Sequence, residues 1–212
     1  MEQLEQVFQD IAATGFPVGG VVHSAGVIDD KMIPELEWTS FETVMSAKGH
    51  GTNNLHLLTK DLKASVNFLV LFSSNTSVVG NIGQANYAAA NAFLDSRAQH
   101  RRAQGLPYIS INRGPWSEVG MAANMGGVAF ESMGLVLVGP KHGMQAPRDC
   151  MNQGTLYQIV VTPVVWPKFL QRFGKNIPQL YSTLAEKELS KKVVAMKKKM
   201  FVWFGHLIRT IS

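Results

Sequence analysis

Blocks of apolar residues, separated by polar and glycine-containing stretches, predict strands that alternate with helices. The clearest block runs from 68 to 72, is apolar at every position and is followed by Ser73 and Ser74. A run without alternation is typical of a strand that is covered on both faces, as in a parallel sheet. Three shorter blocks predict further strands, at 20–23, 108–112 and 158–162.

Other segments carry a helical pattern. Apolar residues recur with a 3.6-residue period in 3–13, and an alanine-rich segment opens at Tyr87. Further helices are predicted at 39–59, 142–153 and 167–173, and the segment 121–140, rich in Gly and Met, predicts a loop that is either a lid or disordered. The alternation of both kinds of element predicts an α/β fold, a mostly parallel sheet with helices on both faces.

The end of the central strand carries candidate chemistry. Ser74 ends the strand, and a polar loop with Gly80 and Gly83 leads into the alanine-rich helix. A spacing of four residues places Tyr87 and Asn91 on one face of that helix, one turn apart. A hydroxyl, a phenol and an amide are therefore expected close together, in an arrangement that can transfer a proton.

Weaker candidates lie at the end of the first strand and in the second helix. The Ser-Ala-Gly turn at 24–26 lets a ligand approach the backbone, but such a turn is also ordinary between a strand and a helix. Gly49 and Gly51 follow Lys48, lower helix stability by about 1 kcal/mol each, and indicate close packing or a nearby ligand. Taken alone, Lys48 is more often a solvated surface lysine.

Composition narrows the class of protein. Of the 212 residues, 46% are hydrophobic and 17% are charged, which is typical of a folded domain. The single cysteine, Cys150, cannot form an internal disulfide, and no Cys/His cluster has the spacing of a zinc site. The N-terminal segment lacks signal-peptide features, and no apolar stretch approaches the ~20 residues of a membrane span, so a cytoplasmic protein without a metal is expected.

The net charge of +5 is concentrated at one end. From Lys187 onward, six lysines and Arg209 oppose Glu188 alone, which gives +6 there and leaves 1–186 at −1. The high pI therefore belongs to the end of the chain and does not indicate nucleic-acid binding. This basic stretch precedes an apolar one; it could contact a membrane surface or a partner, or be an end without selected function, which we favour.

Longer motifs occur in an order that carries a resemblance. They are Val22-His-Ser-Ala-Gly-Val-Ile-Asp-Asp30, the Lys48 region, Leu71-Phe-Ser-Ser74, Gly83-Gln-Ala-Asn-Tyr-Ala-Ala-Ala-Asn-Ala-Phe-Leu-Asp95, and Gly114-Pro-Trp116 with Gly120-Met-Ala122. From Val21 to about Leu184 the chain resembles the ketoreductase domains of modular polyketide synthases and animal-type fatty acid synthases, a branch of the short-chain dehydrogenase/reductase family. Tyrosine followed four residues later by asparagine, where the wider family mostly has lysine, marks this branch.

The resemblance implies a Rossmann-like fold and the NADPH-dependent reduction of a β-ketoacyl thioester on acyl carrier protein, within a multidomain synthase. It assigns catalysis to Lys48, Ser74, Tyr87 and Asn91. In that chemistry Tyr87 donates the proton with a pKa lowered by Lys48, Ser74 hydrogen-bonds the carbonyl, and Asn91 holds Lys48 or a relay water. The cofactor is expected against Lys48, Tyr87, Ser24, Ala25, Gly26, Gly114, Pro115 and Trp116.

The resemblance also informs stereochemistry. Ile28-Asp29-Asp30 resembles the leucine-aspartate-aspartate motif of the ketoreductases called B-type, and Val79 stands where the opposite class usually has tryptophan. Asp29, Asp30 and Gln84 are therefore expected to orient the substrate and give a (3R) hydroxyl. Taken alone, two adjacent acids on a loop are more often solvated.

Two departures from the family pattern affect the prediction. No Gly-x-Gly-x-x-Gly occurs in the chain, so the N-terminal nucleotide-binding strands are expected to be lacking. Arg113 replaces a residue that is commonly tryptophan. We expect a partial catalytic domain at 1–186 and a tail at 187–212 that does not resemble the family. The alternative function is a truncated, non-catalytic remnant or scaffold-like fragment that keeps the four catalytic residues but cannot bind the cofactor alone.

Overall fold

The computed structural model describes residues 1–61, 66–118, 127–151 and 156–191. The chain divides into two compact units, residues 1–125 with 137–163 and residues 126–136 with 164–212. Most of the predicted tail, from 192 onward, lies outside the described residues, as does the motif at 120–122. The domain boundary predicted at residue 186 stays a prediction.

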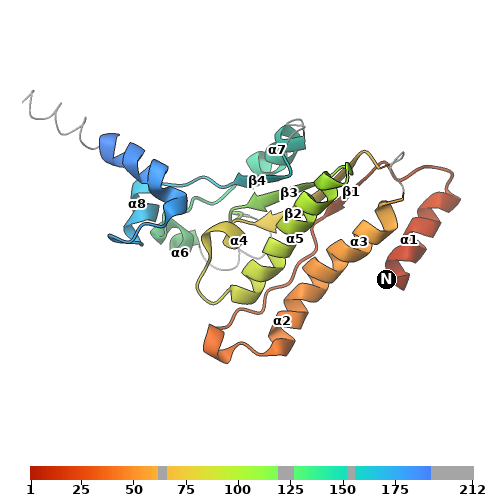
Figure 1. Ribbon diagram of the computed structural model, residues 1–212, viewed down its shortest axis with the longest axis horizontal. Coiled ribbons are helices and arrows are strands. Elements are labelled where there is room, and N and C mark those ends of the chain that lie inside the picture. The colour runs from red at the N-terminus through yellow and green to blue at the C-terminus, as the bar shows by residue number, and fades with distance from the viewer. Residues whose placement is uncertain (62–65, 119–126, 152–155, 192–212) are drawn as a thin grey trace, which may run out of the picture. The chain divides into compact units, whose positions relative to one another are not determined.

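Four parallel strands form one sheet in the first unit, in the order β1-β2-β3-β4 (Figure 1). The strands are β1 (Gly20–His23), β2 (Phe68–Ser74), β3 (Ile109–Arg113) and β4 (Gln158–Val161). All four lie where the apolar blocks predict them. Ser74 pairs with Arg113 across β2 and β3, so the carboxyl ends of these strands meet at one edge of the sheet.

Helices lie on both sides of this sheet, as the alternating pattern predicts. Helix α5 (Ala85–Ala103) contacts β2 and β3, and its Leu94 packs with Leu69 and Leu71 in a buried cluster. Helices α2 (Trp38–Met45) and α3 (Gly51–Thr59) pack beside α5. Helix α7 (Pro140–Met151) contacts β3 and lies on the opposite side of the sheet in Figure 1.

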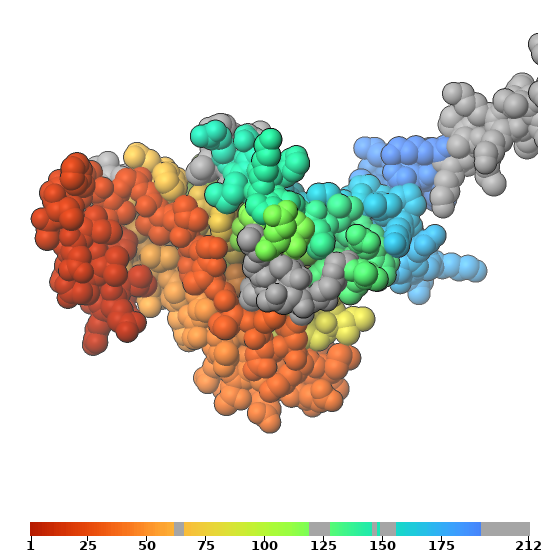
Figure 2. Space-filling view, turned by 180° about the vertical axis from the view of Figure 1, so that it is seen from behind, coloured from red at the N-terminus to blue at the C-terminus, as the bar shows by residue number. Residues whose placement is uncertain are grey.

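Helix α1 (Glu2–Ala13) has no buried residue and contacts α3. Figure 2 shows it, in red, at the margin of the molecular surface. The 3.6-residue period therefore predicts the helix correctly, but none of its apolar residues is buried.

Three segments differ from the predicted pattern. The expected helix at 39–59 is interrupted by one π-helical turn, η2 (Ser46–His50), and such turns are frequent at functional sites. A short helix, α4 (Thr76–Val79), forms within the predicted loop after β2, because the Ser74 hydroxyl accepts a hydrogen bond from the Thr76 N–H at 3.2 Å. Helix α6 (Gly127–Ser132) likewise occupies part of the predicted loop at 121–140.

The second unit is organised around aromatic residues. Helix α8 (Trp166–Gln171) confirms the predicted helix at 167–173, and its Phe169 ring lies 5.7 Å from Trp166, 5.7 Å from Phe173 and 5.4 Å from Tyr181. Tyr181 belongs to the short 3-10 helix Gln179–Tyr181. Across both units, the described residues include no helix long and apolar enough to cross a membrane.

Candidate active site

Three elements bring the four predicted catalytic residues together in the first unit. Lys48 lies on the π-helical turn, Ser74 ends β2, and Tyr87 and Asn91 occupy the first turns of α5. The Lys48 amine lies 5.4 Å from the centre of the Tyr87 ring, and the side chains of Ser74 and Asn91 interact with the phenol. An amine, a hydroxyl, a phenol and an amide thus share one site.

Lys48 is only 3% exposed, so the interpretation as a solvated surface lysine is wrong. Its amine donates a 3.0 Å hydrogen bond to the carbonyl of Phe72 in β2. Burial, with a smaller contribution from the positive charge of Arg113, lowers the pKa of Lys48 to about 8, and the carboxylate of Asp95 opposes this shift. Lys48 is therefore close to the pH at which it loses its charge.

The glycines that follow Lys48 are explained by close packing. A Cβ atom on Gly49 would lie 2.5 Å from the methyl group of Met45, and one on Gly51 would lie 3.2 Å from the ring of His23. Gly49 lies on the π-helical turn next to the Met45 side chain at the end of α2, and Gly51, the first residue of α3, lies against His23 of β1.

Burial raises the pKa of Tyr87 above its ordinary value of 10. Hydrogen bonding with the side chains of Asn91 and Ser74, and the positive charge of Arg113, oppose the rise. The net direction is opposite to the lowered pKa that the sequence predicts, because desolvation of a phenolate outweighs these favourable interactions. In this site Tyr87 is therefore a protonated donor at neutral pH.

Asn91 is fully buried and is held by its own helix. Its side-chain Nδ2 donates to the backbone carbonyl of Tyr87 at 2.7 Å, and its backbone carbonyl accepts from Ser73 Oγ at 3.2 Å. Among the described residues, no group donates to Asn91 Oδ1, which is therefore a buried acceptor. The expected direct bond between Asn91 and Lys48 is not among the hydrogen bonds of the described residues.

A buried network of hydrogen bonds around Asp95 connects α5 with β3 and with the segment that follows β2. Asp95 Oδ1 accepts a hydrogen bond from Ser110 Oγ at 2.6 Å, and its Oδ2 accepts from Ser77 Oγ at 2.7 Å and from Asn112 Nδ2 at 2.8 Å. Asn112 Nδ2 also lies 3.1 Å from the carbonyl oxygen of Ser74. The network therefore fixes α5 to the ends of β2 and β3, close to the candidate catalytic groups.

The sequence analysis does not identify this network, although a signal exists. The four-residue spacing from Tyr87 to Asn91 continues to Asp95, which places the acid on the same helix face. Ser110 and Asn112 alternate along β3 and point toward that face, where they bond Asp95. Their role becomes visible only when the sheet places β3 beneath α5.

His23, at the end of β1, also faces the site. Its side chain is buried, and its Nε2 has no hydrogen-bond partner in the described part of the chain. Burial and the nearby charge of Lys48 lower its pKa below the ordinary 6.5, so the imidazole is neutral at neutral pH. A neutral His23 adds no charge to the Lys48 environment.

Hydrogen bonds tie the acidic loop after β1 to the start of α5. Asp30 Oδ2 accepts from Gln84 Nε2 at 2.8 Å, which joins two of the three residues predicted to orient the substrate. The backbone carbonyl of Asp29 accepts from Asn86 Nδ2 at 2.8 Å. Asp30 is exposed but hydrogen-bonded, and the loop is held at the start of the helix that carries Tyr87.

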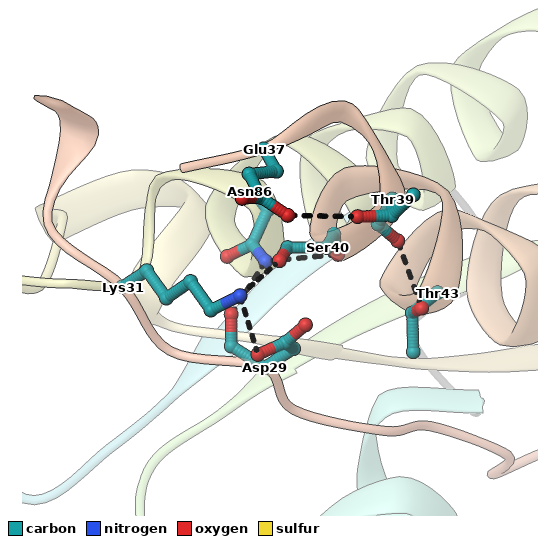
Figure 3. A network of polar contacts seen from close by, with 7 residues as sticks. All are labelled: Asp29, Lys31, Glu37, Thr39, Ser40, Thr43 and Asn86. Atoms are coloured by element: carbon teal, nitrogen blue, oxygen red, sulfur yellow. Dashed lines mark hydrogen bonds and ion pairs between the residues drawn. The ribbon is translucent and has the colours of Figure 1, made fainter. Parts of the chain in front are cut away.

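Figure 3 shows how the other side of this loop is held. Lys31 Nζ lies 3.9 Å from the Asp29 carboxylate and donates to Ser40 Oγ in α2 at 2.8 Å. Asn86 Nδ2 also lies 3.2 Å from the Ser40 carbonyl. Lys31, Ser40 and Asn86 were not predicted as site residues, because their importance comes from contacts between distant segments.

The residues predicted to hold the cofactor fall into two groups. Ser24, Ala25 and Gly26 are exposed beyond the end of β1. Gly114 and Pro115 are buried after β3, and Trp116 is partly buried with a buried indole N–H that has no partner among the described residues. Both groups follow the carboxyl ends of parallel strands, the edge at which open α/β sheets bind ligands.

No metal site competes with this interpretation among the described residues, where no group of three or more His, Cys, Asp or Glu side chains could hold an ion. The placement of the Tyr87 phenol beside the Lys48 amine can support proton transfer.

Comparisons with known proteins identify related chains. Residues 1–118 match the family model described as KR domain. Polyketide synthase GfsB from Streptomyces halstedii is 47% identical over 167 residues, 78% of this chain and 3% of that protein. Mycoketide-CoA synthase from Mycobacterium tuberculosis is 44% identical over 126 residues, 59% of this chain and 3% of that protein. The chain thus spans a small fraction of these multidomain relatives.

Solved structures of ketoreductases share the fold. The first ketoreductase of the tylosin polyketide synthase is 38% identical, with a TM-score of 0.73 over 82% of this chain and 38% of that chain. A structure of A-type ketoreductases from a modular polyketide synthase is 34% identical, with a TM-score of 0.74 over 81% of this chain and 37% of that chain. The chain therefore belongs to the KR domain family, the ketoreductases of polyketide synthases.

Proposed function

We propose that this chain is the catalytic part of a ketoreductase that uses NADPH to reduce a β-ketoacyl thioester on acyl carrier protein to the (3R)-β-hydroxyacyl thioester. The observation that carries the proposal is the convergence of Lys48, Ser74, Tyr87 and Asn91 at the end of β2. Membership of the KR domain family supports a role in ketoreduction within a polyketide synthase.

In the proposed reaction Tyr87 gives its phenolic proton to the substrate carbonyl oxygen. Its raised pKa keeps the phenol protonated at neutral pH, so the donor is ready before the reaction begins. Ser74 lies beside the phenol and donates a hydrogen bond to the same oxygen, which stabilises the negative charge that develops there. When bound, NADPH supplies the hydride.

Lys48 and Asn91 act on Tyr87 rather than on the substrate. The Lys48 amine, 5.4 Å from the ring centre, stabilises the phenolate that remains after proton transfer. Asn91 binds the Tyr87 backbone carbonyl and orients this turn of the helix. Its buried Oδ1 is a suitable acceptor for the water through which Tyr87 regains a proton.

The described residues fit the reactive end of a dinucleotide. The small, exposed residues Ser24, Ala25 and Gly26 leave the backbone accessible beside the site, and the indole N–H of Trp116 is a buried donor without a partner in the described part of the chain. The chain carries no Gly-x-Gly-x-x-Gly to bind the pyrophosphate, so we expect weak or no NADPH binding by the chain alone.

The proposed stereochemistry depends on the acidic loop. The hydrogen bond between Asp30 and Gln84 holds the loop against the start of α5, three residues before Tyr87. A substrate that reaches Tyr87 past this loop is expected to present one face of its ketone. Chiral chromatography of the product would test this, and a mainly (3S) alcohol would reject the stereochemical part of the proposal.

The activity is best tested in a chimaera that joins the nucleotide-binding half of the tylosin ketoreductase to this chain. Acetoacetyl-N-acetylcysteamine serves as the substrate, and the loss of NADPH absorbance measures its reduction. We expect turnover by the chimaera, and Tyr87→Phe should lower it by about 10²–10⁴-fold, the usual contribution of a general acid.

The alternative, a non-catalytic remnant, makes a different prediction for the same protein. A folded chimaera that binds NADPH but reduces no substrate would reject the reductase proposal and favour the remnant. Fluorescence of bound NADPH establishes binding separately from turnover, so that a chimaera without cofactor is not mistaken for an inactive site.

A further inference from the structure

Asn86, the residue before Tyr87, joins α5 to the acidic loop after β1. It lies in the first turn of α5, and its side chain is fully buried. Its Oδ1 accepts a hydrogen bond from the Tyr87 N–H at 2.8 Å, and its Nδ2 donates to the Asp29 carbonyl at 2.8 Å. The same Nδ2 lies 3.2 Å from the carbonyl of Ser40 in α2, within the network drawn in Figure 3. One side chain therefore bonds three segments of the chain.

These contacts use both ends of the Asn86 amide. If the amide were turned over, its Oδ1 would face two carbonyl oxygens and its amino group would face an N–H. An apolar residue of similar size would deprive the Asp29 and Ser40 carbonyls of this donor, and a buried polar group without a partner lowers stability. Packing alone therefore does not account for an asparagine at this position.

Two further hydrogen bonds hold the acidic loop against the segment that precedes Asn86. The Lys31 N–H donates to the Gly83 carbonyl at 2.9 Å, and Gln84 Nε2 donates to Asp30 Oδ2 at 2.8 Å. Three successive residues of the loop are thus bound to residues 83–86. In the described part of the chain, the bond from Asn86 is the one that continues to the residue that carries the phenol. It therefore couples the position of the loop to that of the proton donor.

We propose that Asn86 is a positioning residue of the reductase site, which holds the acidic loop at a fixed distance from Tyr87 and thereby determines which alcohol predominates. The inference rests on the proposed function, in which the substrate passes this loop to reach Tyr87. The buried Asn86 side chain acts through the loop and the helix rather than on the substrate. The ratio of the two alcohols depends on the difference between two activation free energies. A tenfold change in that ratio corresponds to about 1.4 kcal/mol, which is comparable to one hydrogen bond.

Two substitutions separate the contacts of Asn86. Asn86→Asp keeps an acceptor for the Tyr87 N–H but loses both donors, and a carboxylate is favourable in the first turn of a helix. Asn86→Ala loses all three hydrogen bonds. Thr59→Val is the matched control, because Thr59 is also fully buried and its hydroxyl donates to a backbone carbonyl at 2.6 Å. The control removes a hydroxyl whose hydrogen bonds, to Leu55 and Arg101, involve neither the loop nor the phenol-bearing residue.

Amide hydrogen exchange of the full 212-residue chain, followed by NMR, measures the coupling without cofactor or substrate. The Lys31 amide reports on the loop, because it bonds the Gly83 carbonyl, and the Tyr87 amide reports on the helix. In Asn86→Asp we expect exchange at Lys31 to accelerate by about tenfold relative to the amides of β2, while Tyr87 changes less. In Asn86→Ala both amides should accelerate. Thr59→Val should leave both unchanged relative to β2.

The chimaera tests the stereochemical consequence. With acetoacetyl-N-acetylcysteamine as the substrate, Asn86→Asp should lower the ratio of major to minor alcohol, measured by chiral chromatography, by about tenfold. Thr59→Val should leave this ratio unchanged. Unfolded molecules form no product, so a variant that is only less stable gives less alcohol at the wild-type ratio. The ratio therefore distinguishes a positioning role from a general loss of stability.

Several results would overturn the inference. In an active chimaera, an unchanged ratio of alcohols in both Asn86 variants would reject it and leave the proposed function intact. A fall of the same size in Thr59→Val would reject the assignment to Asn86. Complete inactivity of both Asn86 variants would also reject it, because Asn86 would then be needed for the fold rather than for the choice of alcohol. A Lys31 amide that does not respond to Asn86→Asp would refute the coupling itself.

Failure of the proposed function is recognised separately, in the wild-type chimaera. A chimaera that binds NADPH but forms no alcohol would reject the reductase activity, and with it the use of Asn86 in selecting a product. Amide exchange at Lys31 and Tyr87 would still show whether Asn86 couples the loop to the helix. A wild-type chimaera that forms both alcohols in equal amounts would reject the inference while it confirms the reduction.

Discussion

Replacing Lys48 with methionine is expected to stabilise the fold near neutral pH while it removes the amine from the site. Lys48 is 3% exposed, and burial lowers its pKa from 10.5 to about 8. The difference of about 2.5, at about 1.4 kcal/mol for each pKa unit, corresponds to about 3 kcal/mol of unfavourable free energy for a protonated, buried amine. Methionine has a similar length and carries no charge.

The effect has a defined pH window. The amine of the unfolded chain binds a proton below about pH 10.5, whereas the folded chain binds it only below about pH 8. Between these values the unfolded state binds more protons, so the free energy of unfolding of the wild type rises with pH. The variant lacks this dependence. The pH-dependent part of its advantage should be full below about pH 8, shrink as the pH rises, and vanish near pH 10.5.

A decrease in the stability of the variant that does not depend on pH is expected in addition. Methionine cannot donate to the Phe72 carbonyl, and an unpaired acceptor lowers stability by about 1–3 kcal/mol at every pH. The change of the stability difference with pH is therefore the diagnostic quantity, and groups that titrate equally in both proteins cancel from it.

Urea unfolding, followed by circular dichroism at several values from about pH 7 to about pH 10.5, measures this difference. Lys141→Met, at an exposed position of α7, is the matched control and should show no comparable change with pH. If the stability curves of wild type and Lys48→Met run parallel through the whole window, the reasoning that burial lowers the pKa of Lys48 is wrong.

Two further substitutions test the supporting structure. Asp95→Asn should lower the free energy of unfolding by about 1–3 kcal/mol, because a buried acceptor of three hydrogen bonds is altered. It should also lower the pKa of Lys48 further, because an opposing negative charge is lost. Urea unfolding measures the first effect and lysine NMR the second, and an unchanged Lys48 signal would contradict the charge argument. Gly134→Ala should destabilise the second unit more than Gly174→Ala, since both glycines have positive φ but only a Cβ at 134 would lie 2.6 Å from the backbone nitrogen of Phe169. Limited proteolysis compares the two variants, and equal losses would show that the contact with Phe169 does not matter.

The strands were the most predictable part of the fold. The segment 68–72 is apolar at every position and became a strand with buried residues on both faces. The helix at 39–59 was predicted as one continuous element, but the tight packing of Gly49 and Gly51 accompanies a π-helical turn there. A single extra residue in one turn leaves the hydrophobic period almost unchanged, so the pattern does not reveal it.

The candidate site was predictable only in part. The residues Lys48, Ser74, Tyr87 and Asn91 could be identified from motifs, and the structure brings them together. The direction in which the pKa of Tyr87 shifts could not be predicted from motifs, because the pKa of a phenol depends on how far the surrounding atoms exclude water from it.

The alternation of strands and helices, the family, and the residues that carry reactive groups can all be inferred from the amino-acid sequence, since hydrophobic period and motif spacing are local properties. Which of those groups are buried, and which charges face one another, depends on how the strands and helices pack together. Lysine side chains are usually exposed, but Lys48 is buried because its side chain lies against β2 and against Tyr87 of α5. Asp95, on α5, and Arg113, at the end of β3, influence the charge of Lys48 through space, because the packing of the helices on the sheet brings together segments that are distant in the sequence.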